Sequence, residues 1–425
     1  MPSVYRHTIS FDGDAFSVFC VFKNQPQVFF LDSSSHAPQS QFSYIGFAPF
    51  TTVKNGDLLG LRKVFDKYRL VDKGLPFPAG AVGYLGYDGS LFFGFYDTIL
   101  AIDHREDKLI ISSFSKVRIK DILKLLRSLP LAEPFTEKKL ARKHQLEFKS
   151  NFTKAGYIRA VRQALDRIRR GDIYQINLSH QIKVKIPAGL RDIEPAAIYK
   201  NLRQFFPSEF GAYFDDGRQI ILSASPERFL KFQNGIAQVK PMKGTRPRGR
   251  TKTQDRKLKE QLQKSPKEIA ELLMVTDLER NDLGRVCDYK SVKVKAMRTI
   301  ETYSSVFQAT STIEGRLSQG RDQFDLLAAS FPSGSVTGCP KIEAMKIINQ
   351  LEPVKRGLYT GALGYMSFSG SMDFNVMIRT MFINQKQIAF HVGGGIVADS
   401  NPQDEWQETW DKAKSLIDTL EKTFS

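Results

Sequence analysis

Apolar residues recur at the spacing of an α-helix in several stretches of the chain. The clearest stretch is 154–170, where five apolar side chains fall on one helical face and Gly171 follows at the point where the helix would end. The residues of that face are Tyr157, Val161, Ala164, Leu165 and Ile168. Further helices are predicted over 117–129, 255–263, 266–280, 322–329, 340–350 and 403–422.

Short runs rich in β-branched and aromatic residues lie between these helices. They predict strands over 16–22, 28–31, 98–102, 109–114, 173–184, 219–224, 228–233, 236–240, 361–368, 374–383 and 387–392. Many of these strands form neighbouring pairs joined by short turns, such as QNG at 233–235 and NQK at 384–386. Such pairs indicate antiparallel sheets with helices packed on them, which is an α+β fold.

The chain divides into two predicted units. Residues 1–130 form a β-rich N-terminal unit, and residues 131–151, with a proline and a charged run, are typical of a linker. Residues 152–425 form the second unit, and we expect the two units to pack into one globule. A chain of 425 residues that is 41% hydrophobic is long enough for this arrangement.

Composition narrows the class of protein. No stretch reaches the roughly 18 consecutive apolar residues of a membrane helix, and charges stand near the N-terminus where a signal peptide would be apolar. Cys20, Cys287 and Cys339 are too far apart to suggest a disulfide framework or a metal knuckle. We therefore expect a cytoplasmic protein that does not contact a membrane.

The net charge of +17 raises the question of nucleic-acid binding. The densest basic clusters, 137–149 and 246–259, lie apart in the sequence and lack the interleaved aromatic residues of a single-strand binder. An anionic substrate or an acidic partner protein accounts for the charge equally well. We expect no nucleic-acid partner.

Carboxylates in two predicted helices could hold a divalent cation. Glu271 stands among apolar neighbours in helix 266–280, where a carboxylate needs a partner. Glu405 and Glu408 share one face of the last helix, with Lys412 one turn further along. Mg²⁺ takes such oxygen ligands. Solvated helix charges with a Glu408–Lys412 pair are the alternative, and the spacing alone does not decide between them.

Three glycine-rich turns, 332–341, 358–365 and 391–400, could bind an anion through exposed backbone N–H groups. The first leads into a helix at Pro340, and the run GGGIV allows backbone to approach a ligand closely. Tight turns between strands are the alternative. None of the three matches a phosphate-binding motif.

Glu227 and Lys243 stand at the ends of neighbouring predicted strands and could face one cavity. In such a cavity a glutamate could act as a general acid, and a desolvated lysine as a nucleophile or base. A solvent-exposed lysine beside a Gly-Thr turn is the alternative.

Together and in this order, the segments resemble the chorismate-utilising enzymes, which include anthranilate, aminodeoxychorismate, isochorismate and salicylate synthases. The matching motifs are GDIYQINLS, SASPERFL, PMKGTRPRG, AELLMVTDLERNDLGRV, SVTGCPK, EAMKIINQLEP, YTGALGY, IRT and GGGIVADS…EWQET. They span about 152–421, and AGAVGYLGYDG extends the likeness into the N-terminal unit. The resemblance implies an anthranilate-synthase-component-I-like fold, with antiparallel sheets packed face to face and helices on the outside.

The resemblance also implies roles for individual residues. Glu271 and Glu408 would bind Mg²⁺, with Glu405 supporting through water, and Glu227 would protonate the departing C4 hydroxyl of chorismate. Substrate-binding positions are implied at Gln175, Thr245, Thr337, Tyr359, Arg379, Gly393, Gly394, Gly395 and Lys412.

Two positions sort the members of this family. Water-adding enzymes have a lysine base in the place of Gln175, and glutamine cannot act as that base. Anthranilate synthases have alanine in the place of Lys243, whereas aminodeoxychorismate synthases have a lysine that attacks C2 as the C4 hydroxyl leaves. The resemblance therefore favours 4-amination of chorismate for folate synthesis, with anthranilate synthesis as the alternative. A non-catalytic regulatory or nucleic-acid-binding protein on this fold is a further alternative, and the complete set of glutamates argues against it.

The resemblance has consequences for partners and ligands. The chain contains no glutaminase signature, so a separate glutamine amidotransferase subunit would supply ammonia. In some members the N-terminal unit binds tryptophan, and FLDSSS at 30–35 is where we would place such a site. Cys339 and Gln308 depart from the family, which usually has alanine at the first position and often histidine at the second.

Overall fold

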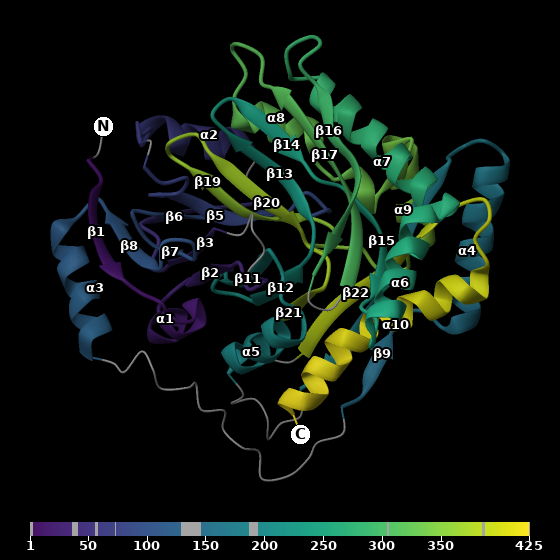
Figure 1. Cartoon of the computed structure of the whole chain (residues 1–425), viewed down its shortest axis with the longest axis horizontal. Helices are drawn as coiled ribbons and strands as arrows, with labels where there is room; N and C mark the ends of the chain where they lie inside the picture. The colour runs from purple at the N-terminus through teal and green to yellow at the C-terminus, as the bar shows by residue number, and fades with distance from the viewer. Residues whose placement is uncertain are drawn as a thin grey trace.

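The computed structural model describes residues 3–35, 41–55, 58–72, 74–128, 146–186, 194–303, 306–384 and 387–424. Two large sheets dominate the described chain (Figure 1). Every pairing between named strands is antiparallel.

The first sheet has 12 strands, with β9 beside β10 at one end. Its order is β1 (Tyr5–Ser10), β8 (Lys108–Ser113), β7 (Thr98–Asp103), β3 (Phe42–Gly46), β2 (Phe29–Asp32), β11 (Phe210–Asp215), β12 (Ile220–Ser225), β21 (Thr380–Ile383), β22 (Gln387–Ile396), β10 (Gln175–Lys185) and β18 (Gly338–Cys339), with β9 spanning Phe148–Ser150.

The second sheet has 10 strands, with β16 beside β17. Its order is β15 (Met242–Pro247), β17 (Val306–Arg316), β14 (Ile236–Val239), β13 (Arg228–Gln233), β20 (Met372–Val376), β19 (Ala362–Ser367), β5 (Gly80–Leu85), β6 (Leu91–Tyr96) and β4 (Thr51–Lys54), with β16 spanning Lys293–Thr302.

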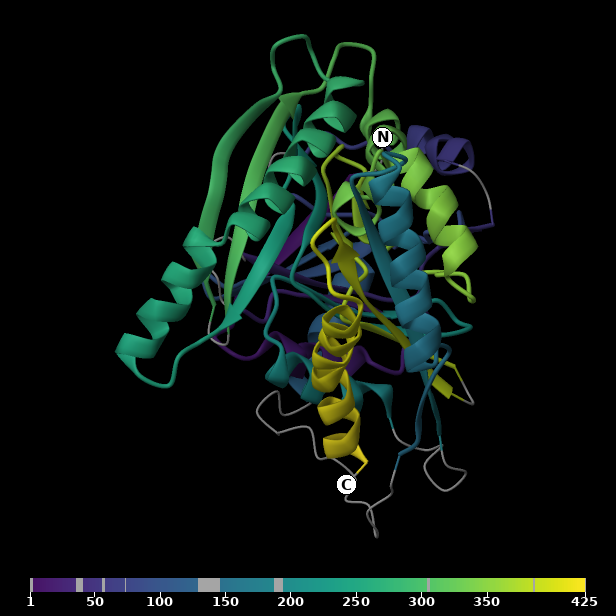
Figure 2. The same cartoon turned by 90° about the vertical axis from the view of Figure 1, so that its right-hand side faces the viewer.

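The helices of the described chain cover the outer faces of these sheets. They are α1 (Ala15–Phe22), α2 (Leu58–Lys67), α3 (Lys116–Ser128), α4 (Lys154–Arg169), α5 (Pro195–Phe205), α6 (Lys252–Lys264), α7 (Pro266–Gly284), α8 (Gln323–Ser330), the short 3₁₀ helix η2 (Gly334–Val336), α9 (Lys341–Leu351) and α10 (Pro402–Thr423). Seen from the right-hand side of Figure 1, α10 lies between α4 on one side and α6 and α7 on the other (Figure 2).

A layer of buried aromatic and aliphatic side chains fills the space between the two sheets. Tyr44 of the first sheet packs edge-on against Tyr365 of the second at 5.5 Å, and Phe77 stacks on Tyr365 at 4.5 Å. Separate cores lie under the helices, one between the first sheet and α1, α3, α5 and α10, another between the second sheet and α2 and α8. The α+β class and the face-to-face packing predicted from the sequence are confirmed.

Both sheets combine strands from the two ends of the chain. β2 pairs with β11, and β5 pairs with β19, so each sheet is continuous across segments that are far apart in the sequence. Most of the predicted linker 131–151 lies outside the described residues, and the division into 1–130 and 152–425 stays a prediction.

Two of the predicted strands are wrong. Residues 16–22 lie in helix α1, because the side chain of Asp14 accepts a hydrogen bond from the N–H of Phe16 and starts a helix that is buried against the first sheet. The predicted strand 374–383 is two strands, β20 and β21, which belong to different sheets. Helices α2 and α5 and the long strands β16 and β17 were not predicted.

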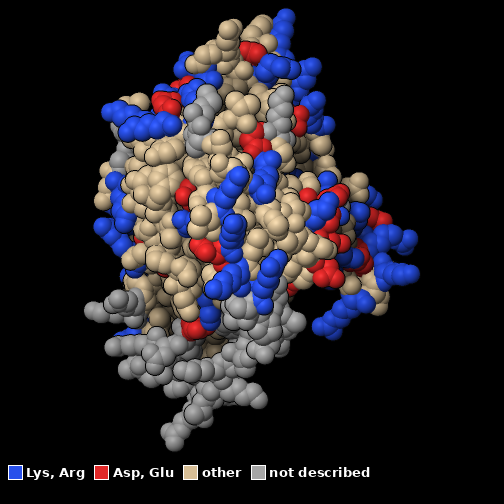
Figure 3. All heavy atoms as spheres, turned by 90° about the vertical axis from the view of Figure 1, so that its left-hand side faces the viewer, with Lys and Arg blue, Asp and Glu red and all other residues tan. Residues whose placement is uncertain are grey.

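Two surface properties bear on the partners of the protein. On the face shown in Figure 3, Lys and Arg side chains stand in several groups and do not form one stripe. Among the described residues, no helix combines the length and the apolar character that crossing a bilayer requires.

Candidate active site

A cavity of about 600 Å³ lies where β15, α7, β22 and α10 meet. The predicted site residues that line it are Glu227, Lys243, Thr245, Glu271, Tyr359, Arg379, Gly393, Gly395, Glu408 and Lys412. The other four, Gln175, Thr337, Gly394 and Glu405, do not line the cavity and are buried beside residues that do. The cavity therefore collects residues that are far apart in the sequence and that belong to both sheets.

Lys243 and Glu227 line the cavity from different parts of the second sheet, because β17 and β14 lie between β15 and β13. Lys243 lies on β15, and its Nζ donates a 3.1 Å hydrogen bond to the carbonyl of Ser335. Glu227 stands between β12 and β13 and is 3% exposed. Its Oε1 is buried and has no hydrogen-bond partner among the described residues. The pair offers a lysine and a carboxyl group to one enclosed space.

Burial shifts the protonation of both groups in directions that suit catalysis. It lowers the pKa of Lys243, although Glu271 and Glu227 act in the opposite direction. It raises the pKa of Glu227 to about 7, against the hydrogen bond from Ser335 and the charge of Lys243. A lowered lysine pKa favours the neutral amine, which is a nucleophile, and a raised glutamate pKa favours the protonated acid, so both shifts suit the predicted roles.

The three glutamates predicted to bind a metal come from two helices. Nowhere in the described chain do three His, Cys, Asp or Glu side chains already enclose a metal position. Glu408 is ion-paired with Lys412 at 2.7 Å, and Glu405 accepts a 2.6 Å hydrogen bond from Ser400. Burial raises the pKa of Glu271, and the charge of Glu408 raises it further.

Two observations test whether this set fits a divalent cation. Oε2 of Glu405 is buried without a hydrogen-bond partner among the described residues. A methyl group on Gly394 would lie 3.1 Å from that oxygen and 3.6 Å from Oε1 of Glu408, so the glycine keeps the space beside both carboxylates free. Carboxylate oxygens are the donors that Mg²⁺ prefers. The donor set fits, and the bound ion stays a prediction.

Arg379 reaches the cavity from the point where the chain passes from one sheet to the other. It lies between β20 and β21, and its φ of 49° is in the left-handed region that non-glycine residues seldom adopt. Burial lowers the pKa of its guanidinium. Among the described residues, none forms a hydrogen bond or an ion pair with this guanidinium. A half-buried guanidinium without a partner suits a carboxylate ligand.

Tyr359 forms one wall of the cavity together with a residue that the sequence analysis missed. His391 stacks on the Tyr359 ring at 4.9 Å, and burial lowers the pKa of His391 to about 3, so the imidazole is neutral. The guanidinium of Arg356 lies 5.8 Å from the same ring and is buried. Arg356 donates hydrogen bonds to the carbonyls of Val336 and Asn177. Through these contacts Arg356 holds together the segments around Asn177, Val336 and Tyr359 beside the cavity.

The other predicted substrate-binding residues make different contacts around the cavity. Lys412 donates a 2.9 Å hydrogen bond to the carbonyl of Gly393. The hydroxyl of Thr337 turns back to its own loop and donates to the carbonyl of Ser333 at 3.0 Å. A methyl group on Gly395 would collide with Nε2 of Gln175 and would lie 3.5 Å from Nζ of Lys243. The side chains of Gln175 and Lys243 therefore both lie beside Gly395.

Several further residues line the cavity without having been predicted, among them Asn177, Lys267, Glu268, Ser335 and His391. Ser335 and His391 stand in glycine-rich turns that the sequence did single out, so position in those turns was the available signal. Glu268 forms an ion pair with Arg246 at 2.7 Å. Glu268 precedes Glu271 by three residues on α7, and this spacing was the signal for it.

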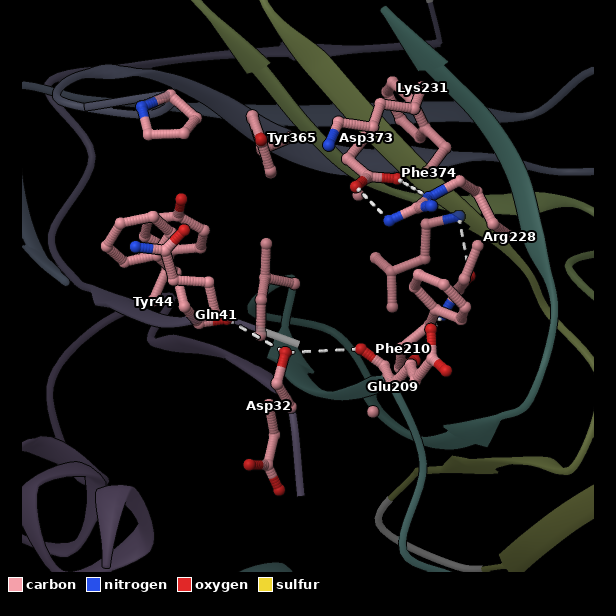
Figure 4. A pocket seen from close by; sticks show the side chains of 18 of the residues that line it. Asp32, Gln41, Tyr44, Glu209, Phe210, Arg228, Lys231, Tyr365, Asp373 and Phe374 are labelled. Atoms are coloured by element: carbon pink, nitrogen blue, oxygen red, sulfur yellow. Dashed lines mark hydrogen bonds and ion pairs between the residues drawn. The ribbon is translucent and has the colours of Figure 1, made fainter. Parts of the chain in front are cut away.

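A second cavity, of about 200 Å³, lies between the two sheets (Figure 4). Asp32 and Ser33, from the FLDSSS stretch, line it. Tyr44 and Tyr365 line it as well, and Arg228 is ion-paired there with Asp373 at 3.0 Å. The sequence expectation about this stretch therefore corresponds to a cavity, and its occupant stays a prediction.

Comparison with known proteins agrees with this architecture. The family model for chorismate binding enzymes matches residues 34–418. Anthranilate synthase component 1 of Thermus thermophilus is 34% identical over 93% of this chain and 92% of its own length. Aminodeoxychorismate synthase component 1 of Salmonella typhimurium is 36% identical over 82% of this chain and 78% of its own length.

A solved structure confirms the predicted fold family. Anthranilate synthase component I from Streptococcus pneumoniae superimposes with a TM-score of 0.78 at 30% identity, covering 90% of this chain and 93% of that one. Family match, relatives and fold agree, and the chain belongs to the chorismate-binding enzyme family.

Proposed function

We propose that this member of the family is the component I subunit of an aminodeoxychorismate synthase, which converts chorismate and ammonia into 4-amino-4-deoxychorismate. The observation that carries the proposal is Lys243, which lies in the cavity near the carboxyl group of Glu227 and has a lowered pKa. A lysine at this place gives the site a nucleophile of its own.

In the proposed reaction, neutral Lys243 attacks C2 of chorismate. The ring double bond shifts, and the C4 hydroxyl takes a proton from Glu227 and leaves as water. Ammonia then adds at C4, the double bond shifts back, and the amine of Lys243 leaves C2. Covalent catalysis of this kind replaces one difficult substitution by two easier ones.

Mg²⁺ is part of the proposal. Glu271 and Glu408 would hold it, with Glu405 behind them, and it would offset the negative charge of a substrate carboxylate. Arg379 and Lys412 bring positive charge to the same cavity. Chorismate carries two carboxylates, so these groups neutralise the substrate and favour charge development in the transition state.

The proposal includes a partner subunit. Relatives of this chain are named component 1 of their synthases, under both activities. We propose that a glutamine amidotransferase subunit supplies the ammonia, and that the product feeds folate synthesis in the cytoplasm. Anthranilate synthase is the second candidate, because relatives with that name match at similar identity.

The first experiment identifies the product. Purified chain is given chorismate, Mg²⁺ and ammonium salt, and the products are separated by chromatography and mass. We expect 4-amino-4-deoxychorismate. Fluorescent anthranilate as the main product would contradict the proposal in favour of the second candidate.

The second experiment tests the covalent step. Without ammonia, acid-quenched protein should gain the mass of chorismate less one water, located on Lys243. Lys243→Ala should abolish the adduct and lower product formation by roughly a hundredfold or more. Lys231→Ala is the matched control, since Lys231 also has a pKa lowered by burial but lines the second cavity. Full activity of Lys243→Ala would contradict the covalent mechanism.

A further inference from the structure

A second buried carboxyl group lies behind Glu227. Glu279 of α7 is 2% exposed, and its Oε1 accepts hydrogen bonds from Oγ of Ser333 at 3.0 Å and from the N–H of Gly334 at 2.9 Å. Oγ of Ser333 is also 2.9 Å from Oγ of Ser335. Ser335 and Glu227 line the same cavity, and Ser335 lowers the pKa of the Glu227 carboxyl group. Two buried hydroxyl groups therefore lead from Glu279 toward Glu227.

None of the residues that the structure describes forms an ion pair with Glu279. Lys341 faces it, but the ammonium of Lys341 is hydrogen-bonded to Asp282 and to the carbonyls of Ser330 and Pro332. Oε2 of Glu279 is buried without a hydrogen-bond partner among the described residues. A purely structural role would leave this oxygen as an uncompensated cost, because an unpaired buried acceptor destabilises a fold.

We propose that Glu279 is a positioning residue for the general acid: it shares a proton with Glu227 through the hydroxyls of Ser333 and Ser335 and so keeps Glu227 protonated during turnover. The inference rests on the acid role that the proposed function gives to Glu227.

The protons balance over a turnover that begins with both carboxyl groups protonated, so the pair holds two protons at the start and shares the one that remains after Glu227 has protonated the leaving hydroxyl. When Glu227 gives its proton to the departing C4 hydroxyl, Ser335 passes its hydroxyl proton to Glu227, Ser333 replaces the proton of Ser335, and Glu279 replaces that of Ser333. Each serine loses one proton and gains one, and Glu279 ends as a carboxylate. The attacking amine loses one proton as its bond to carbon is completed, and this proton returns along the same chain to Glu279.

The charges around the pair support such sharing. Burial raises the pKa of Glu227 to about 7 and that of Glu279 to about 7. The charge of Glu279 raises the pKa of Glu227, while Lys243 lowers it. For Glu279, Lys341 lowers the pKa and Asp282 raises it. Two coupled groups of this kind lose their protons in two steps, and the last shared proton leaves at a higher pH than it would from either group alone.

The test is the pH profile of chorismate consumption with Mg²⁺ and ammonium salt. Activity needs protonated Glu227, so it falls as pH rises through the pKa of that group. In Glu279→Gln the neighbouring charge is absent, and we expect this fall to move to lower pH by roughly one unit. Ser333→Ala breaks the chain but keeps the charge, so we expect kcat to fall several-fold with KM little changed.

Ser330→Ala is the matched control. Ser330 is a buried serine of the preceding helix whose Oγ has no hydrogen-bond partner among the described residues. Its removal should leave the pH profile unchanged. A profile of Glu279→Gln that coincides with that of the unaltered protein would overturn the inference.

Two readouts separate this inference from the proposed function. Chorismate consumption reports on Glu227 whichever product forms, so an anthranilate product would contradict only the proposed function. Infrared titration of the protonated carboxyl C=O band needs no turnover. It should show two groups titrating near neutral pH in the unaltered protein, and one group at lower pH in Glu279→Gln. An unshifted remaining group would contradict the coupling.

Discussion

Arg379 combines an unusual backbone conformation with a half-buried positive charge. Its φ of 49° lies at the crossing between the two sheets, and its guanidinium lacks a recorded partner among the described residues. Both features cost free energy in the ligand-free protein. A substrate carboxylate in the cavity would supply the missing anion, so the cost is consistent with a binding role.

Replacing Arg379 by an uncharged residue should therefore stabilise the fold and weaken substrate binding. We expect Arg379→Gln to raise the free energy of unfolding by about 1 kcal/mol, because a half-buried charge without a partner is removed, and to raise KM for chorismate by roughly a hundredfold. Urea denaturation and steady-state kinetics measure the two effects. Arg356→Gln is the comparison, since Arg356 is ion-paired with Glu352 at 2.8 Å and its loss should destabilise the protein. Lower stability of Arg379→Gln would contradict the argument.

Sequence patterns predicted the chemically distinctive residues that line the cavity, but not the buried residues that lie behind them. Lys243 and Glu227 were predicted because motifs carry them, and both line the cavity. Glu279 and Arg356 were missed, because their partners are brought to them only by tertiary structure: Ser333 is 54 residues from Glu279. No periodicity or local spacing encodes such a contact.

Helix α10 illustrates how one element positions several site residues. It begins at Pro402, where the side chain of Asn401 accepts hydrogen bonds from the N–H groups of Gln403 and Asp404. Glu405 and Glu408 follow within the first two turns. The start of the helix therefore fixes the placement of the two carboxylates.

We predict that Asn401→Ala weakens metal dependence as well as stability. Loss of the cap should cost about 1 kcal/mol of unfolding free energy, and fraying of the first turn should raise the Mg²⁺ concentration for half-maximal activity several-fold. Thr153→Ala is the control, because Thr153 caps α4 in the same manner and α4 carries none of the proposed ligands. An equal change of Mg²⁺ requirement in both variants would show that the effect is general destabilisation.

The strands were less predictable than the helices for a physical reason. Residues 374–383 form one continuous run in sequence, yet β20 pairs with β19 and β13 in one sheet and β21 pairs with β12 and β22 in the other. An amphipathic helix satisfies its backbone hydrogen bonds within itself, whereas a strand depends on partner strands that can come from any part of the chain. The break at Arg379 follows from those partners and has no local signal.

At the scale of the whole molecule, neither sheet is complete without both ends of the chain. β2 and β5 come from the first 128 residues, and they pair with β11 and β19 from the part after residue 145. The core between the sheets also draws on both parts, with Phe77 and Tyr44 from the first and Tyr365 from the second. The 600 Å³ cavity is lined by residues from Asn177 onward, but the sheets that hold these residues include strands of the first part.

This continuity predicts how the protein responds when it is divided. Residues 146–425 produced alone should aggregate or fail to unfold cooperatively, because β11 and β19 would each lose a neighbour and the apolar faces between the sheets would meet water. Co-expression of residues 1–137 with 138–425 should restore soluble protein and chorismate turnover, since the pairings β2–β11 and β5–β19 need no covalent link. Size-exclusion chromatography, thermal unfolding and the chorismate assay measure the outcome. A stable, active fragment 146–425 would show instead that the second part folds independently, with the N-terminal strands as an addition to a finished core.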